Sequence, residues 1–200
     1  MSLLPVILGM LAAFAPLAID MYLPALPAMA TALGSDSGGA QLTIASYFVG
    51  MGLGQLIYGP LTDRFGRRPP LFVGVGLFLL ASLACALAQT LPQMVALRFV
   101  QALGGCAGMV VARAVVRDVA HLRDPVRLMG RLMLIMGVAP ILAPFMGGVL
   151  SAWLGWRSIF VFLALFAGMA LLLVALLLPE THAPERRLRQ SPRAIIRAYA

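Results

Sequence analysis

The chain alternates between long apolar stretches and short polar ones. Six stretches are apolar over about twenty residues, and the pieces between them are short and carry Pro, Gly, Ser, Asp and Arg. A helix needs about 20 apolar residues, at about 1.5 Å each, to cross the roughly 30 Å core of a bilayer. We therefore expect six membrane-spanning helices, at Leu3 to Leu23, Leu42 to Thr62, Leu71 to Ala88, Met94 to Val116, Leu132 to Ala152 and Ile159 to Leu178.

The composition favours the same class of protein. Hydrophobic residues make up 62% of the chain and charged residues 11%, whereas soluble domains have about 25% charged residues. A surface facing water could not be covered by so few polar side chains, which excludes an ordinary soluble enzyme.

The first span is long, follows no Lys or Arg and precedes five more spans. We interpret it as a retained helix, although Ala28 to Ala30 resembles a signal-peptide cleavage site.

The basic residues, all arginines, gather on one side of the predicted spans. The net charge is +8, and thirteen of the fifteen arginines lie in the second connection, the fourth connection and the tail. The positive-inside rule places these segments and the N-terminus in the cytoplasm. We expect a transmembrane unit at residues 1–179 and the start of a cytoplasmic central loop at 180–200, with a short interfacial helix from Ser191. Because the charge follows topology, no nucleic-acid partner is expected.

A shift of 89 residues aligns the second connection with the fifth. The pairs include Gly59 with Gly148, Gly66 with Gly155, and Arg68 with Arg157. Each copy would contain three helices, an odd number, so the second copy would be inverted across the membrane, as in many secondary transporters. The match fades outside this stretch, which leaves chance as the alternative.

Two charged residues lie within predicted spans, where a charge costs about 2.5–3.5 kcal/mol on insertion scales. Asp20 lies near the outer end of the first span, beside Tyr22. It is interpreted as a cavity carboxylate that exchanges a proton or pairs with a cationic substrate, or alternatively as an interfacial residue near water. Arg98 shares a helical face with Gln101 and needs an acceptor such as a carbonyl or carboxylate. Its alternative is snorkelling to the outer interface.

Small residues and prolines follow one face of the fifth span. Such a face lets helices approach closely, and its prolines interrupt the helix. Gly50 and Gly54 suggest the same close packing in the second span. The residues on the fifth-span face are Gly137, Pro140, Pro144, Gly147 and Gly148.

The connection after the second span holds Gly59, Asp63, Arg64, Gly66, Arg67 and Arg68. Arg98 and Gln101 lie in the fourth span, and Pro144, Gly147 and Gly148 lie in the fifth. These residues resemble three motifs of the major facilitator superfamily, namely the signature loop between helices 2 and 3, the helix 4 motif and the helix 5 motif of its antiporters. In the helix 5 motif, alanines stand at two positions where glycines are usual. Segments 155–157 and 178–181 fit the start and end of helix 6.

Two further segments resemble the bicyclomycin/chloramphenicol (Bcr/CflA) branch of bacterial drug exporters. They are residues 20–27 and the end of the fourth span, with Arg113, Arg117 and Asp118. The resemblance implies an all-α, polytopic membrane fold that is the N-terminal half of a twelve-helix transporter, built as two inverted three-helix repeats. It implies no enzyme, no metal and no cofactor.

The resemblance also implies a function for the whole protein. We expect proton-coupled export of a hydrophobic or cationic drug-like compound across the bacterial inner membrane. Asp20, Tyr22, Arg98 and Gln101 would face the cavity, and Asp63 with its neighbouring arginines would contact the missing C-terminal half. The proton, the bilayer and that half are the expected partners.

Two alternatives stay open. One is a nutrient or metabolite transporter on the same scaffold, because a fold hosts many functions. The other is a six-helix fragment without transport activity of its own. An integral membrane enzyme is not expected, because His121 and His182 lack metal-ligand spacing and no nucleophile constellation is present.

Overall fold

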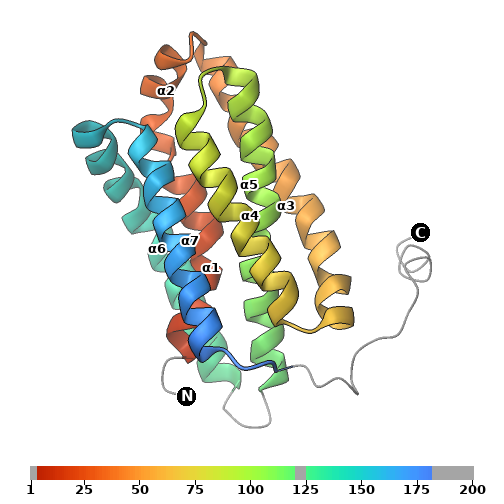
Figure 1. Cartoon of the computed structure of the whole chain (residues 1–200). Coiled ribbons are helices and arrows are strands. Elements are labelled where there is room, and N and C mark those ends of the chain that lie inside the picture. Colours follow the sequence, from red (N-terminus) through yellow and green to blue (C-terminus); the bar gives the residue numbers. More distant parts are fainter. Residues whose placement is uncertain (1–3, 120–124, 182–200) are drawn as a thin grey trace.

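The computed structural model describes residues 4–119 and 125–181, which form a bundle of long helices (Figure 1). Within these two ranges six helical spans are long and apolar enough to cross a membrane, which confirms the number predicted. His121 and the predicted interfacial helix from Ser191 lie outside the described residues. The elements are α1 (Leu4–Asp20), the 3₁₀ helix η1 (Leu23–Ala25), α2 (Leu26–Ala32), α3 (Ser37–Phe65), α4 (Arg68–Leu87), α5 (Leu91–Asp118), α6 (Pro125–Leu154) and α7 (Arg157–Leu177).

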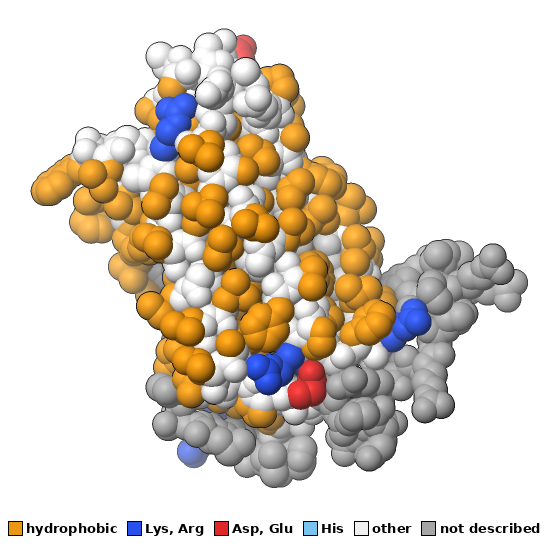
Figure 2. Space-filling view, in the orientation of Figure 1, with side chains coloured by type: hydrophobic (Ala, Val, Ile, Leu, Met, Phe, Trp, Pro, Cys, Tyr) orange, Lys and Arg blue, Asp and Glu red, His pale blue; other side chains and the backbone are white. Residues whose placement is uncertain are grey.

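The helices are longer than the apolar stretches that predicted them. α3 begins at Ser37 rather than Leu42, and α6 begins at Pro125 rather than Leu132. The 30 residues of α6 correspond to about 45 Å, more than the roughly 30 Å of hydrocarbon. The added turns carry polar residues such as Arg127, which a headgroup region tolerates. Figure 2 shows apolar side chains over the middle of the visible face and charged ones towards its two ends.

The first span does not end at Leu23 as predicted. α1 stops at Asp20, and η1 and α2 continue the span to Ala32. Pro24 and Pro27 are the second residues of η1 and α2, in the first turn, where the missing N–H would have no intrahelical partner. The two prolines therefore start new helical segments, and the span is interrupted directly after Asp20.

The predicted internal repeat is present in the helix boundaries. α3 ends at Phe65 and α6 at Leu154, and α4 and α7 begin at the same 89-residue shift. The turn after each first helix uses a glycine with positive φ, 91° at Gly66 and 80° at Gly155, a conformation that a Cβ would strain. The two turns lie at opposite ends of the bundle (Figure 1), so the second copy is inverted.

Glycines bring the helices of the two copies into backbone contact. A Cβ on Gly104 of α5 would lie 2.5 Å from the carbonyl oxygen of Gly74 in α4. A Cβ on Gly50 of α3 would lie 2.5 Å from the carbonyl oxygen of Phe99 in α5. The close packing predicted at Gly50 is therefore present, and it encloses the middle of α5 among its neighbours.

Candidate functional site

Arg98 lies about two turns into α5, with 0% of its surface exposed. Its Nη1 donates to Gln101 Oε1 at 2.7 Å, and its Nη2 donates to the carbonyl oxygen of Ala18 in α1 at 3.0 Å. Gln101 Nε2 in turn donates to Ser82 Oγ of α4 at 2.8 Å, and Ser82 donates to the Phe78 carbonyl. The acceptors are thus a carbonyl and an amide, and the snorkelling alternative for Arg98 is wrong.

Aromatic rings surround the remaining faces of the Arg98 guanidinium. The ring centroid of Tyr47 lies 4.3 Å from its carbon, that of Tyr22 4.6 Å and that of Phe160 5.9 Å. Cation–π contacts of this kind stabilise a desolvated guanidinium. Its Nε is buried without a hydrogen-bond partner. Within residues 4–119 and 125–181 no carboxylate pairs with Arg98, so its positive charge is not compensated.

Tyr22 connects this site to the interrupted first span. Its hydroxyl lies 2.8 Å from Thr43 Oγ1 of α3, and it donates to the Met29 sulfur at 2.7 Å. Asp20 is half-buried at the end of α1 and is not bonded to Arg98. The structure therefore brings together Tyr22, Arg98 and Gln101, with Asp20 next to this group along the chain.

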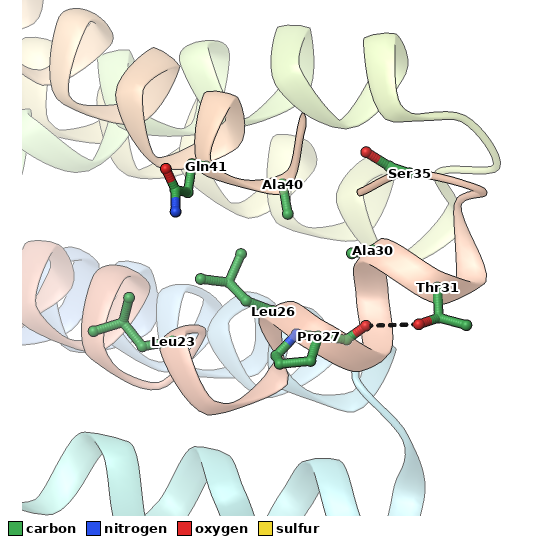
Figure 3. Close-up of a pocket in the computed structure, with 8 residues that line it drawn as sticks. All are labelled: Leu23, Leu26, Pro27, Ala30, Thr31, Ser35, Ala40 and Gln41. Carbon is green, nitrogen blue, oxygen red and sulfur yellow. Dashed lines mark hydrogen bonds between the residues drawn. The ribbon is translucent and has the colours of Figure 1, made fainter. Parts of the chain in front are cut away.

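A pocket of about 450 Å³ opens beside the same segment. Figure 3 shows Leu23 and Leu26 of the first span facing Ala40 and Gln41 of α3 across it, with the Thr31–Pro27 hydrogen bond at one end. Its walls are mostly apolar with a few hydroxyl and amide groups, which is typical of small-molecule pockets.

Gly147 sets the separation between α6 and the end of α1. A Cβ on Gly147 would overlap the carbonyl oxygen of Met21, the residue after Asp20, whereas a Cβ on Gly148 would meet no atom within 4 Å. Gly137 is equally open, and Pro140 and Pro144 lie inside α6. Of the motif's three glycines, Gly147 is the one at which a side chain would collide with the backbone that directly follows α1.

We expect Gly147→Ala to lower the free energy of unfolding by about 1–3 kcal/mol, because overpacking against a backbone group forces the helices apart. Gly148→Ala is expected to change it by less than about 0.5 kcal/mol. Both values can be measured by reversible unfolding in mixed micelles. Equal effects of the two substitutions would contradict the contact with Met21.

Arg67 joins three segments at the end of the bundle that holds the α3–α4 turn, which we call the arginine-rich end. Only 5% of Arg67 is exposed. Its Nε and Nη2 donate to the two carboxylate oxygens of Asp118 at 2.8 and 3.2 Å, and its Nη1 donates to Asp63 at 2.7 Å. Burial alone would lower the pKa of Arg67, but the hydrogen bonds to Asp118 and Asp63 outweigh it and raise that pKa. The guanidinium therefore stays charged.

Glu180 and Thr181 extend this cluster, and the sequence did not single them out as site residues. Glu180 accepts hydrogen bonds from the backbone N–H groups of Arg67 and Arg68 at 2.9 and 3.1 Å. A carboxylate there caps the N-terminus of α4 and complements its dipole. Thr181 donates to Asp118 at 3.1 Å. The one feature of the sequence that could have indicated Glu180 and Thr181 is their position directly after the last span.

The other predicted residues of this end are dispersed. Arg64 is exposed and lies over the Phe65 ring, with its guanidinium carbon 5.2 Å from the ring centroid. Arg68 donates to the Ala175 carbonyl of α7 at 3.1 Å.

Arg113 and Arg117 are exposed on α5, and Gly59 faces open space. Arg67 and Arg68 are thus bonded within the six-helix unit, which leaves Arg64 and the 42% exposed side chain of Asp63 available to other partners.

Known proteins are similar to this chain in sequence and in fold. The profile described as Major Facilitator Superfamily matches residues 8–198. The "Chloramphenicol resistance protein" of Pseudomonas aeruginosa is 42% identical over 76% of this chain, and the "Bicyclomycin resistance protein homolog" of Haemophilus influenzae is 35% identical over 90%. The chain spans 36% and 46% of these relatives, which is less than half of each.

A solved structure has the same fold. The crystal structure of the human organic anion transporter MFSD10 (TETRAN) superposes with a TM-score of 0.72 at 23% identity, over 96% of this chain and 51% of that one. The profile match covers nearly all of the described residues and agrees with the motifs and the inverted repeat. The chain therefore belongs to the major facilitator superfamily, a family of membrane transporters and not of enzymes.

Proposed function

We propose that this chain is the N-terminal six-helix half of a bacterial inner-membrane exporter, which expels hydrophobic or cationic drug-like compounds in exchange for protons. Residues 1–179 form its transmembrane unit and residues 180–200 begin its central loop. The arginine-rich end, the N-terminus and the tail face the cytoplasm. The half-length match to relatives named for drug resistance supports the proposal.

The single observation that carries proton coupling is Arg98, a fully buried cation with neutral partners. A buried charge without a counter-ion is costly, so a deprotonated carboxylate close to Arg98 is favoured over a protonated one. Asp20 is the acid in reach, because Ala18 and Tyr22 on either side of it both contact Arg98. Movement at the interruption after Asp20 then changes the distance between the two charges, and with it the proton affinity of Asp20.

The Arg67 cluster provides the second element of the mechanism. Asp63 uses one carboxylate oxygen for Arg67 and is partly exposed beside Arg64. Contacts from these residues to the C-terminal half stabilise one of the two states of the transporter, and breaking them favours the other. Gly147 lets α6 pack closely on the end of α1, so movement of α6 is transmitted to the segment that holds Asp20.

The proposal is tested in cells that express the whole transporter of which this chain is a part. Collapse of the proton gradient is expected to stop the efflux of ethidium, a fluorescent hydrophobic cation. Asp20→Asn is expected to reduce efflux to the level of cells without the transporter. Asp36→Asn is the control, because Asp36 only caps α3 and Asn caps equally well. Efflux that survives the collapse, or that Asp20→Asn leaves unchanged, would contradict proton coupling.

A further inference from the structure

A second pocket lies among α1, α5 and α6, towards the arginine-rich end. Its volume is about 540 Å³, within the range of pockets that hold drug-sized molecules. Met109 of α5 and Met129, Met133 and Met136 of α6 contribute to its wall. Methionine side chains are flexible and polarisable, so such a wall adapts to ring systems of different shapes.

Arg113 gives this pocket its charge. Among the described residues that line the pocket, it is the one charged side chain. It forms no ion pair with a described carboxylate. The described acids of the arginine-rich end are engaged elsewhere: Asp63 and Asp118 bind the Arg67 side chain, and Glu180 caps α4. The pocket therefore combines an apolar wall with a cation that no described carboxylate neutralises, which repels a cationic ligand and attracts an anionic one.

We propose that this pocket binds amphipathic organic anions, compounds with an apolar ring system and one carboxylate or sulfonate. The ring lies among the methionines, and the acid group accepts hydrogen bonds from the Arg113 guanidinium. The role of the site in transport rests on the proposed function, but binding itself requires only the six-helix chain. Anions would then be a second substrate class beside the cations that Asp20 attracts.

The proposal is tested with two probes that differ only in charge, dansylglycine and its neutral amide, dansylglycinamide. The purified chain in uncharged maltoside micelles is titrated at neutral pH, and dansyl fluorescence is corrected for empty micelles. We expect dansylglycine to bind at least about tenfold more tightly than the amide, because one charge-assisted hydrogen bond accounts for that difference.

Three variants locate the site. Arg113→Gln is expected to weaken dansylglycine to the affinity of the amide, whereas Arg117→Gln, about one turn further along α5 and outside the pocket, leaves the preference intact. Gly137 lines the pocket, and a Cβ there meets no atom within 4 Å. Gly137→Leu should therefore fill the pocket and weaken both probes at least about tenfold, with circular dichroism to confirm that the variant is folded.

Equal binding of the acid and the amide by the unmodified chain would overturn the proposal, as would an unchanged preference in Arg113→Gln. Either result is expected if the pocket holds only detergent or a lipid acyl chain. The outcome is independent of the efflux experiment. A transporter that fails to exchange protons could still bind dansylglycine at Arg113.

Discussion

Replacement of Arg67 by methionine is expected to lower the free energy of unfolding of the chain by about 3–5 kcal/mol, because it removes the hydrogen bonds and the opposite charge that offset the desolvation of a buried carboxylate. The partner that loses these contacts is Asp118, whose side chain is 15% exposed and which accepts two hydrogen bonds from Arg67. Asp63 contributes little, because its side chain is 42% exposed and solvent screens its charge. Reversible unfolding in mixed dodecyl sulfate and maltoside micelles, followed by circular dichroism, measures the change.

Arg64→Met is the matched control for this prediction. Arg64 belongs to the same motif but is exposed, so its replacement should change the free energy of unfolding by less than about 0.5 kcal/mol. Removing both charges of the pair, as Arg67→Met with Asp118→Leu, should cost less than the sum of the single substitutions. Additive effects, or equal effects at Arg64 and Arg67, would show that the pair does not hold these segments together.

Hydropathy was sufficient to predict the number of membrane-spanning helices. Each span is an apolar stretch longer than a soluble helix needs, so the number of helices followed from bilayer thickness alone. The repeat was readable because its turns need glycine at Gly66 and Gly155. The ends of the helices were less predictable: Arg127 lies inside α6 and Pro27 inside the first span, since helices continue into the headgroup region and proline is accepted in a first turn.

The repeat also places two arginine contacts that sequence reasoning did not predict. Arg68 at the start of α4 donates to the Ala175 carbonyl near the end of α7, and Arg157 at the start of α7 donates to the Ala88 carbonyl at the end of α4. Each guanidinium supplies a donor to the carbonyl end of the antiparallel neighbour, which also suits the helix dipole. The two contacts follow from the inverted symmetry, which places the start of α4 beside the end of α7 and the start of α7 beside the end of α4.

The candidate site was only partly predictable, for a physical reason. Arg98 and Gln101 were paired correctly, because residues three apart on a helix face the same way. Arg64 and Arg67 could not be distinguished, because the carboxylate that accepts two hydrogen bonds from Arg67, that of Asp118, lies 51 residues away. The rings of Tyr47 and Phe160 come from two further helices. The sequence of an apolar span does not distinguish an aromatic residue that contacts a buried cation from one that faces lipid.

The Arg98 site makes a second stability prediction. Gln101→Leu removes the acceptor of Arg98 Nη1 and the donor to Ser82, so a fully buried cation keeps one hydrogen bond, to Ala18. A hydrogen bond to a charged group is worth about 1.5–3 kcal/mol, and an unsatisfied buried donor adds to the loss. We expect the free energy of unfolding to fall by about 3 kcal/mol, measured in the same micelles.

Two control substitutions, Gln55→Leu and Gln101→Glu, distinguish the loss of the hydrogen bond to Arg98 from a general loss of polarity. Gln55 is exposed on α3, so Gln55→Leu should change stability by less than about 0.5 kcal/mol. Gln101→Glu keeps an acceptor for Arg98 and brings a counter-charge to it, so it should cost less than about 1 kcal/mol. If Gln101→Leu proved as mild as Gln55→Leu, Arg98 would have to find another partner. The proposal that the charge of Arg98 favours the deprotonated carboxylate of Asp20 would then lose its basis.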